Sequence, residues 1–305
     1  MRKARRSFAR LSLVGTQSHP PICPYPLALL QSRPFTIKRA AISSSSSALF
    51  ECSRKAVNPI YIKMFSMKLS DLTEEFDWNG MMGTTARRMR DTGFETWGFL
   101  IYRCTYGDDE AWDRYMALFK QDVHDDLVYN GREWLMEPYA QWTVIEDKET
   151  LNGASKQQVR EHFVQWRDQH SVSYELSEAA RVARQLFPTP NDANTRLPRF
   201  TYCLYVDQKC LDTLKAYLDA KANGAPLLHS LVVVIVDADY SPAGYTHPYR
   251  RYPDIEGCTE EYVGWEYALA RYVASLYDVL HSERLDLGGS YRRPPGIYPS
   301  RLEFM

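Results

Sequence analysis

The stretch Leu231-Val-Val-Val-Ile-Val-Asp237 is the strongest strand signal in the chain. Six apolar and mostly β-branched residues precede the aspartate, which is typical of a strand buried on both faces of a sheet. Three other runs, 97–102, 142–145 and 200–206, are rich in aromatic and β-branched residues and also predict strands. The fold should therefore be organised around a sheet that contains Leu231–Val236.

Helices are predicted where apolar residues recur at three- and four-residue spacing behind a side chain that can cap the helix. The four expected ranges run from Asp108 to about Leu127, from Ser155 through Trp166, from Leu176 to Phe187, and from Asp207 to near Gly224. A last, long helix is expected to begin at Thr259 and to reach Val279, with Trp265 and Leu269 on its buried side.

The expected order of elements is β-α-β, then a pair of helices, then β-α-β-α. Without the helical pair the pattern is β-α-β-β-α-β, so the predicted fold class is α+β: a ferredoxin-like sheet with an inserted helical pair and a long C-terminal helix. That topology places the fourth strand at an edge, whereas Leu231–Val236 is as apolar as a central strand. An open α/β sheet is therefore the alternative.

The composition is that of a soluble, folded protein. The chain has 305 residues, of which 45% are hydrophobic and 25% are charged, and its formal net charge is −1. No run approaches about 18 consecutive apolar residues, so no membrane span is expected. The six cysteines show no C-x-x-C spacing, which indicates reduced thiols. We expect a disordered basic leader or a mis-extended start at 1–66, a single α+β domain at 67–285, and a flexible tail at 286–305.

Residues 1–50 differ in charge from the rest of the chain. They carry eight basic residues and no acidic one, which leaves a net charge of −9 on residues 51–305. A segment rich in Arg and Ser and free of acids is typical of a mitochondrial transit peptide. Because Met64 and Met67 follow shortly afterwards, a start placed too early explains the same segment. The expected location is intracellular and cytoplasmic, and mitochondrial if residues 1–63 act as a transit peptide.

Four blocks of the sequence carry a family resemblance: Trp97–Trp112, Arg199–Val206, Val232–Asp239 and Gly264–Tyr267. They are similar to blocks of a family of uncharacterised proteins predicted from filamentous-fungal genomes. The resemblance covers about residues 94–281. It implies limits for the domain and no known activity.

The pair Asp237 and Asp239 follows the strongest strand directly. Alternation along an extended chain places both carboxylates on one side of the strand end, about 6–7 Å apart. Two carboxylates in such a position can hold Mg²⁺ or Mn²⁺, with water and substrate phosphates completing the coordination shell. Aspartates also terminate strands for turn formation, so the pair has a purely structural interpretation as well.

The loop 240–257 is the second candidate site, because it is longer than ordinary connections and combines tyrosine with arginine. These residue types dominate recognition surfaces. The candidate partner-binding residues are Tyr240, Tyr245, His247, Tyr249, Arg250, Arg251 and Tyr252. Nucleic acid is an unlikely partner, since residues 51–305 are acidic overall.

The sequence contains no phosphate-binding loop, dinucleotide fingerprint, H-E-x-x-H zinc motif or G-x-S-x-G nucleophile motif. The leading hypothesis is therefore a non-enzymatic binding or interaction module that holds an unknown protein or small molecule through the loop 240–257 and needs no cofactor. The alternative is a divalent-metal enzyme acting on a phosphate-containing substrate through Asp237 and Asp239.

Overall fold

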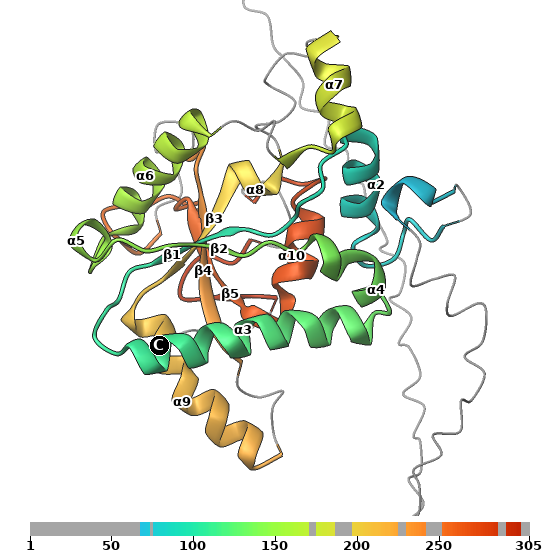
Figure 1. Ribbon diagram of the computed structural model, residues 1–305. Helices are drawn as coiled ribbons and strands as arrows, with labels where there is room; N and C mark the ends of the chain where they lie inside the picture. The colour runs from blue at the N-terminus through green and yellow to red at the C-terminus, as the bar shows by residue number, and fades with distance from the viewer. Residues whose placement is uncertain are drawn as a thin grey trace, which may run out of the picture. The chain divides into compact units, whose positions relative to one another are not determined.

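A six-stranded mixed sheet forms the centre of the described structure, with the strand order β2-β1-β3-β4-β5-β6 (Figure 1). The computed structural model describes residues 68–73, 76–170, 175–186, 197–224, 230–241, 252–285 and 291–299. The strands are β1 (Leu100–Arg103), β2 (Thr143–Ile145), β3 (Tyr202–Val206), β4 (Val232–Asp237), β5 (Trp265–Leu269) and β6 (Ile297–Tyr298).

The strand β4 lies in the middle of the sheet and runs against its neighbours. It pairs antiparallel with β3 on one side and with β5 on the other. The strand β1 is parallel to both β2 and β3, and β5 is parallel to β6. Every residue of β4 is buried, as its unbroken apolar run predicts.

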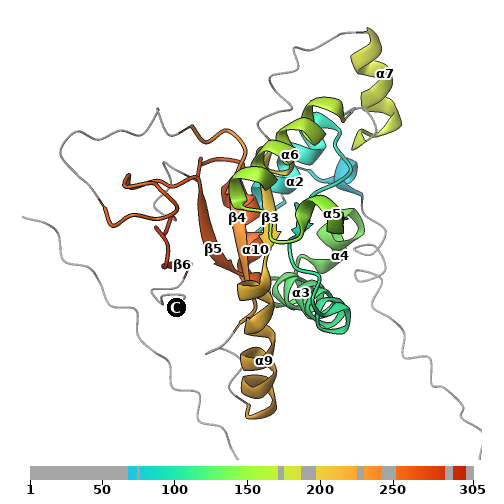
Figure 2. The same ribbon diagram turned by 90° about the vertical axis from the view of Figure 1, so that its left-hand side faces the viewer.

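Helices cover both faces of the sheet. They are α2 (Gly83–Thr92), α3 (Asp109–Tyr129), α4 (Glu133–Met136), α5 (Lys148–Leu151), α6 (Lys156–Gln169), α7 (Glu178–Leu186), α8 (Pro198–Thr201), α9 (Gln208–Ala222) and α10 (Val273–Val279). Tyr102 of β1 packs edge-on against Phe163 of α6, with ring centroids 6.4 Å apart. Phe99 packs against Tyr277 of α10, with centroids 4.9 Å apart. Because positions 99 and 102 face opposite ways along an extended chain, α6 and α10 lie on opposite faces, as Figures 1 and 2 also show.

The expected helices are confirmed where a capping side chain marks their start. The carboxylates of Asp108 and Asp207 accept hydrogen bonds from the backbone N–H groups of the first turns of α3 and α9. Ser155 and Gln158 form the predicted capping box at the start of α6. The helix expected at 176–187 corresponds to α7.

The long helix expected at 259–279 is wrong. Trp265–Leu269 is the strand β5, and a 3₁₀ turn, Ala270–Tyr272, leads from it into the short helix α10. Trp265 and Leu269 are four positions apart, which fits a helix, but with Tyr267 between them the same residues also fit the two-residue period of a strand. Pairing decides between the two, because the central β4 needs a neighbour on each side for its backbone N–H and C=O groups. Trp265 is buried as expected, and Leu269 is half-buried.

The ferredoxin-like topology is not confirmed. There the fourth strand would close the sheet beside the first, whereas β4 lies between β3 and β5. The sequence analysis expected the α+β domain to end at residue 285, and the structure differs there. Residues 291–299 were expected in a tail, but β6 pairs with β5 and extends the sheet.

Two buried arginines join strand ends. The Arg199 guanidinium donates to the backbone oxygens of Gly98 and Gln141 and to the Thr143 hydroxyl, at 2.8, 3.1 and 3.1 Å. It also forms a buried ion pair with Glu175. Arg160 of α6 donates to the backbone oxygens of Asp237 and Gly264, which joins the end of β4 to the approach to β5.

Glu266 of β5 is a fully buried carboxyl group. The backbone N–H of Arg292 donates to its Oε2 at 2.7 Å, and its Oε1 has no hydrogen-bond partner. Burial raises the pKa of Glu266 to about 8, although the Arg292 N–H bond and charge act in the opposite direction. Glu266 is therefore mostly protonated at neutral pH in the folded protein.

Shortening a β4 side chain should destabilise the protein strongly. Ile235 is 0% exposed, and Ile235→Ala should lower the free energy of unfolding by about 2–5 kcal/mol through lost burial and a cavity. Urea unfolding measures this change. Val182→Ala, at a 45% exposed position of α7, is the control and should stay within about 0.5 kcal/mol. Equal effects of the two variants would contradict a central β4.

Glu266→Gln should remove a pH dependence of stability. The folded pKa lies above the unfolded one, so the stabilisation is complete below the unfolded pKa and is lost as pH rises toward the folded pKa. The Tm of the variant relative to wild type should therefore rise between about pH 5 and pH 9. The exposed Glu261→Gln is the control and should show no such trend. Parallel Tm curves for Glu266→Gln and wild type would show that Glu266 ionises freely.

Candidate functional site

Asp237 and Asp239 are each engaged by different partners. Asp237 is 2% exposed; its Oδ1 accepts from the backbone N–H of Asp239 at 2.8 Å and its Oδ2 accepts from the Tyr262 hydroxyl at 2.7 Å. Asp239 lies beyond the end of β4 and pairs with Arg167 at 2.9 Å. Burial raises the pKa of Asp237, while its two hydrogen bonds oppose this shift. These contacts are those of a strand-end turn.

No group of three or more His, Cys, Asp and Glu side chains suited to a metal ion occurs among the residues that the structure describes. Those residues also contain no helix long and apolar enough to cross a membrane. The described cysteines, Cys104, Cys203, Cys210 and Cys258, are free thiols.

The loop 240–257 is described only at its two ends. Tyr240 lies under the Arg160 guanidinium, 4.9 Å from ring centroid to Cζ, and its hydroxyl is 3.4 Å from Cys258 Sγ. Tyr252 lies under Arg293 at 5.2 Å. The other candidate residues lie outside the described residues: Tyr245, His247, Tyr249, Arg250 and Arg251.

A hollow of about 380 Å³ lies beside the ends of this loop. Lys156 Nζ is 4.2 Å from the Trp265 ring centroid and forms an ion pair with Glu256 at 2.6 Å. Glu256 has a φ of 51°, and the following Gly257 has a φ of 85°, which are the left-handed conformations of a two-residue hairpin turn. The loop end is thus fixed against the start of α6 by a charge pair.

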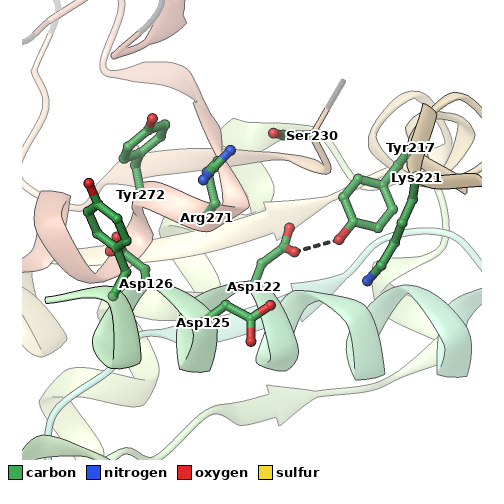
Figure 3. Close-up of a pocket in the computed structure, with 9 residues that line it drawn as sticks. Asp122, Asp125, Asp126, Tyr217, Lys221, Ser230, Arg271 and Tyr272 are labelled. Carbon is green, nitrogen blue, oxygen red and sulfur yellow. Dashed lines mark hydrogen bonds between the residues drawn. The ribbon is translucent and has the colours of Figure 1, made fainter. Parts of the chain in front are cut away.

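A larger hollow of about 640 Å³ lies between α3, α9 and the 3₁₀ turn that follows β5. Its charged and polar lining includes Asp122, Asp125, Asp126, Tyr217, Lys221 and Arg271, and we call it the acidic hollow. Figure 3 shows the three carboxylates rising from α3 beneath the side chains of α9 and the turn. Tyr129, Tyr272 and Ser230 complete the lining.

The fold explains why these residues meet. Asp125 and Asp126 follow Asp122 by three and four positions on α3, so each lies on the same helix face as Asp122. Tyr217 and Lys221 share a face of α9 for the same reason. Arg271 follows β5, whose last residues pair with the start of β4. The acidic hollow thus lies at the end of the sheet where β3 and β5 terminate.

Asp122 is the most deeply buried carboxyl group of the acidic hollow. Its side chain is directed from α3 toward the space below Arg271 and Tyr217 (Figure 3). The Tyr217 hydroxyl donates to Oδ1 at 2.6 Å, whereas Oδ2 has no hydrogen-bond partner. Burial raises the pKa of Asp122, and the Tyr217 bond together with Lys221 and Arg271 acts in the opposite direction.

The other two carboxylates are less buried and keep some acceptor capacity. Asp126 accepts from Ser275 Oγ at 3.4 Å and from Asn130 Nδ2 at 3.2 Å, and burial raises its pKa as well. Asp125 is exposed and accepts from Gln121 at 2.7 Å.

The sequence analysis missed the acidic hollow. Its only local signal is the group of acids at 122, 125 and 126 near the end of a predicted helix, and such a group is usually a solvated helix face. The opposing wall comes from residues about 95 to 150 positions away, which no local pattern connects to α3.

No family model, curated protein or solved structure matches the chain. The similarity to a fungal family remains an expectation from the sequence blocks alone.

Asp237 should prove structural when metal is added. Mg²⁺ or Mn²⁺ at millimolar concentration should leave the Tm of the wild type unchanged. Asp237→Ala should lower the free energy of unfolding by about 1–3 kcal/mol, because Tyr262 and the Asp239 N–H lose their acceptor. Asp239→Asn should have a smaller effect, since its ion pair is exposed. A metal-dependent rise in Tm that disappears in the Asp237→Asn/Asp239→Asn variant would establish a metal site instead.

Proposed function

We propose that the protein is a binding module and that the acidic hollow holds the positively charged group of a small ligand. The observation that carries the proposal is the Asp122 carboxyl group, which is 9% exposed, lines the hollow and leaves Oδ2 without a partner. A buried carboxylate oxygen normally has a donor. Because Oδ2 is covered by protein atoms, an ammonium or guanidinium group in the hollow would stabilise the negative charge of Asp122 through space.

The position of the carboxylates in α3 supports the same proposal. Asp122, Asp125 and Asp126 repel one another across one helix face. Asp126 also lies in the last turn of α3, where the helix dipole disfavours negative charge, and this turn has no basic residue. The arrangement lowers the stability of the helix. A departure from local preferences of this kind is expected where residues serve binding.

Size and shape also suit a small ligand. A volume of about 640 Å³ lies within the range of about 300–1,000 Å³ typical of ligand pockets. The walls stand on α3 and α9, so the charged groups are held by regular secondary structure rather than by a loop. Tyr129, which is 88% exposed, supplies an aromatic surface at the rim.

Partner binding through the loop 240–257 is a second proposal, favoured by the hollow that includes Tyr240 and Glu256. Divalent-metal catalysis through Asp237 and Asp239 remains the alternative from the sequence. The contacts of Asp237 with Asp239 and Tyr262 support it less than a turn-forming role.

Cationic probes test the proposed function. Phenethylamine, butylamine and agmatine should bind the full chain, as measured by isothermal titration calorimetry, and at least one should do so at millimolar concentration or below. Asp122→Asn keeps an acceptor for Tyr217 but loses the charge, and should weaken binding about 10- to 100-fold. Affinity should rise with pH through the raised pKa of Asp122, because the ionised carboxylate is the binding form.

The matched control is Asp113→Asn, which removes the same charge from an exposed position of α3 outside the acidic hollow. It should leave the affinity unchanged. Absence of binding by all three cations, or equal weakening by Asp113→Asn and Asp122→Asn, would contradict the proposed function.

A further inference from the structure

The acidic hollow also contains two basic side chains that none of its carboxylates neutralises. Lys221 and Arg271 line the same space as the three aspartates. Within the part of the chain that the structure describes, neither forms an ion pair with a carboxylate. Such pairs form readily when flexible side chains of opposite charge share a surface. Their absence here shows that the two kinds of charge are held apart.

Aromatic rings hold the two cations in place. Lys221 Nζ lies 5.6 Å from the Tyr217 ring centroid, and Arg271 Cζ lies 5.3 Å from that of Tyr272. A cation against an aromatic face is attracted to it without losing its charge. Both cations are still near enough to lower the pKa of Asp122, so their fields reach the carboxylate across the hollow. Figure 3 shows Arg271 and Lys221 on either side of the Asp122 carboxyl group, so the space between Asp122 and Arg271 is bounded by opposite charges.

We infer that the natural ligand of the acidic hollow is a zwitterion of the amino-acid type, with an ammonium group beside Asp122 and a carboxylate that binds at Arg271. This inference rests on the proposed function and adds the second charged group of the ligand. A cation alone is repelled by Arg271 and Lys221, and an anion alone is repelled by the three aspartates. A molecule with both groups makes two attractive contacts, and each attraction offsets the repulsion that the other group experiences.

Asp122, Asp125 and Asp126 of α3 supply the negative charge of the hollow, and Arg271 supplies the positive charge across from Asp122. Lys221 lies on the α9 side of Asp122. Tyr129, Tyr217 and Tyr272 are the aromatic residues of the lining. Their rings can contact the apolar body of the ligand. The volume exceeds that of a single small amino acid, which leaves room for an aromatic side chain or a second residue.

Three probes with one common body separate the charges. Phenylalanine carries both groups, phenethylamine only the cation and 3-phenylpropionate only the anion. In calorimetry with the full chain, phenylalanine should bind at least ten times more tightly than either of the others. Arg271→Gln should reduce the affinity for phenylalanine to about that for phenethylamine, and should leave phenethylamine binding unchanged or tighter. Lys221→Gln should have a smaller effect, because Lys221 lies on the other side of Asp122 from Arg271.

Lys215→Gln is the matched control, because it removes a positive charge from an exposed position of α9 outside the hollow. It should change none of the three affinities. If phenethylamine binds as tightly as phenylalanine, is weakened by Asp122→Asn and is insensitive to Arg271→Gln, the zwitterion inference is wrong while the proposed function stands. If neither phenylalanine nor the cationic probes bind, both are overturned.

Discussion

The buried guanidinium of Arg199 is the interaction on which the arrangement of the parallel strands depends. It contacts the chain just before β1, at the approach to β2 and within β2, and it precedes β3 by only three residues. Glu175 neutralises the charge, and all three nitrogens of the buried cation donate hydrogen bonds where the three parallel strands begin. Truncating either partner would leave a buried charge without compensation, and such losses are among the most destabilising. Register at this end therefore depends on one side chain.

At the opposite ends of β3 and β5, the sheet supports a site. Placing β4 antiparallel in the centre brings the end of β5 beside the start of β4, and Arg271 follows immediately. The connection through α9 carries Tyr217 to α3, where its hydroxyl meets Asp122. The helices α3 and α9 thus pack against each other and, together with the end of β5, form the walls of the acidic hollow.

The sequence predicted those parts of the fold that depend on local patterns. Strands β1 to β4 and the capped helices α3, α6 and α9 follow from apolar runs and from capping residues such as Asp108 and Asp207. The apolar character of 231–236 correctly argued against an edge position. β5 was missed because Trp265–Leu269 fits two periods, and only its pairing with β4 selects the strand. The acidic hollow was missed because its walls meet only after folding.

The lining of the acidic hollow consists of buried and exposed residues, and the two kinds differ in how freely they can change during evolution. Asp122 and Tyr217 are buried and bonded to each other, so substitutions there disturb the packing of α3 against α9. Asp125, Tyr129 and Lys221 are exposed and line the same hollow. Changes at these three positions can alter the preference for the proposed ligand while the helices keep their contacts. The hollow therefore combines a buried pair that packing constrains with a rim whose residues can change without loss of the fold.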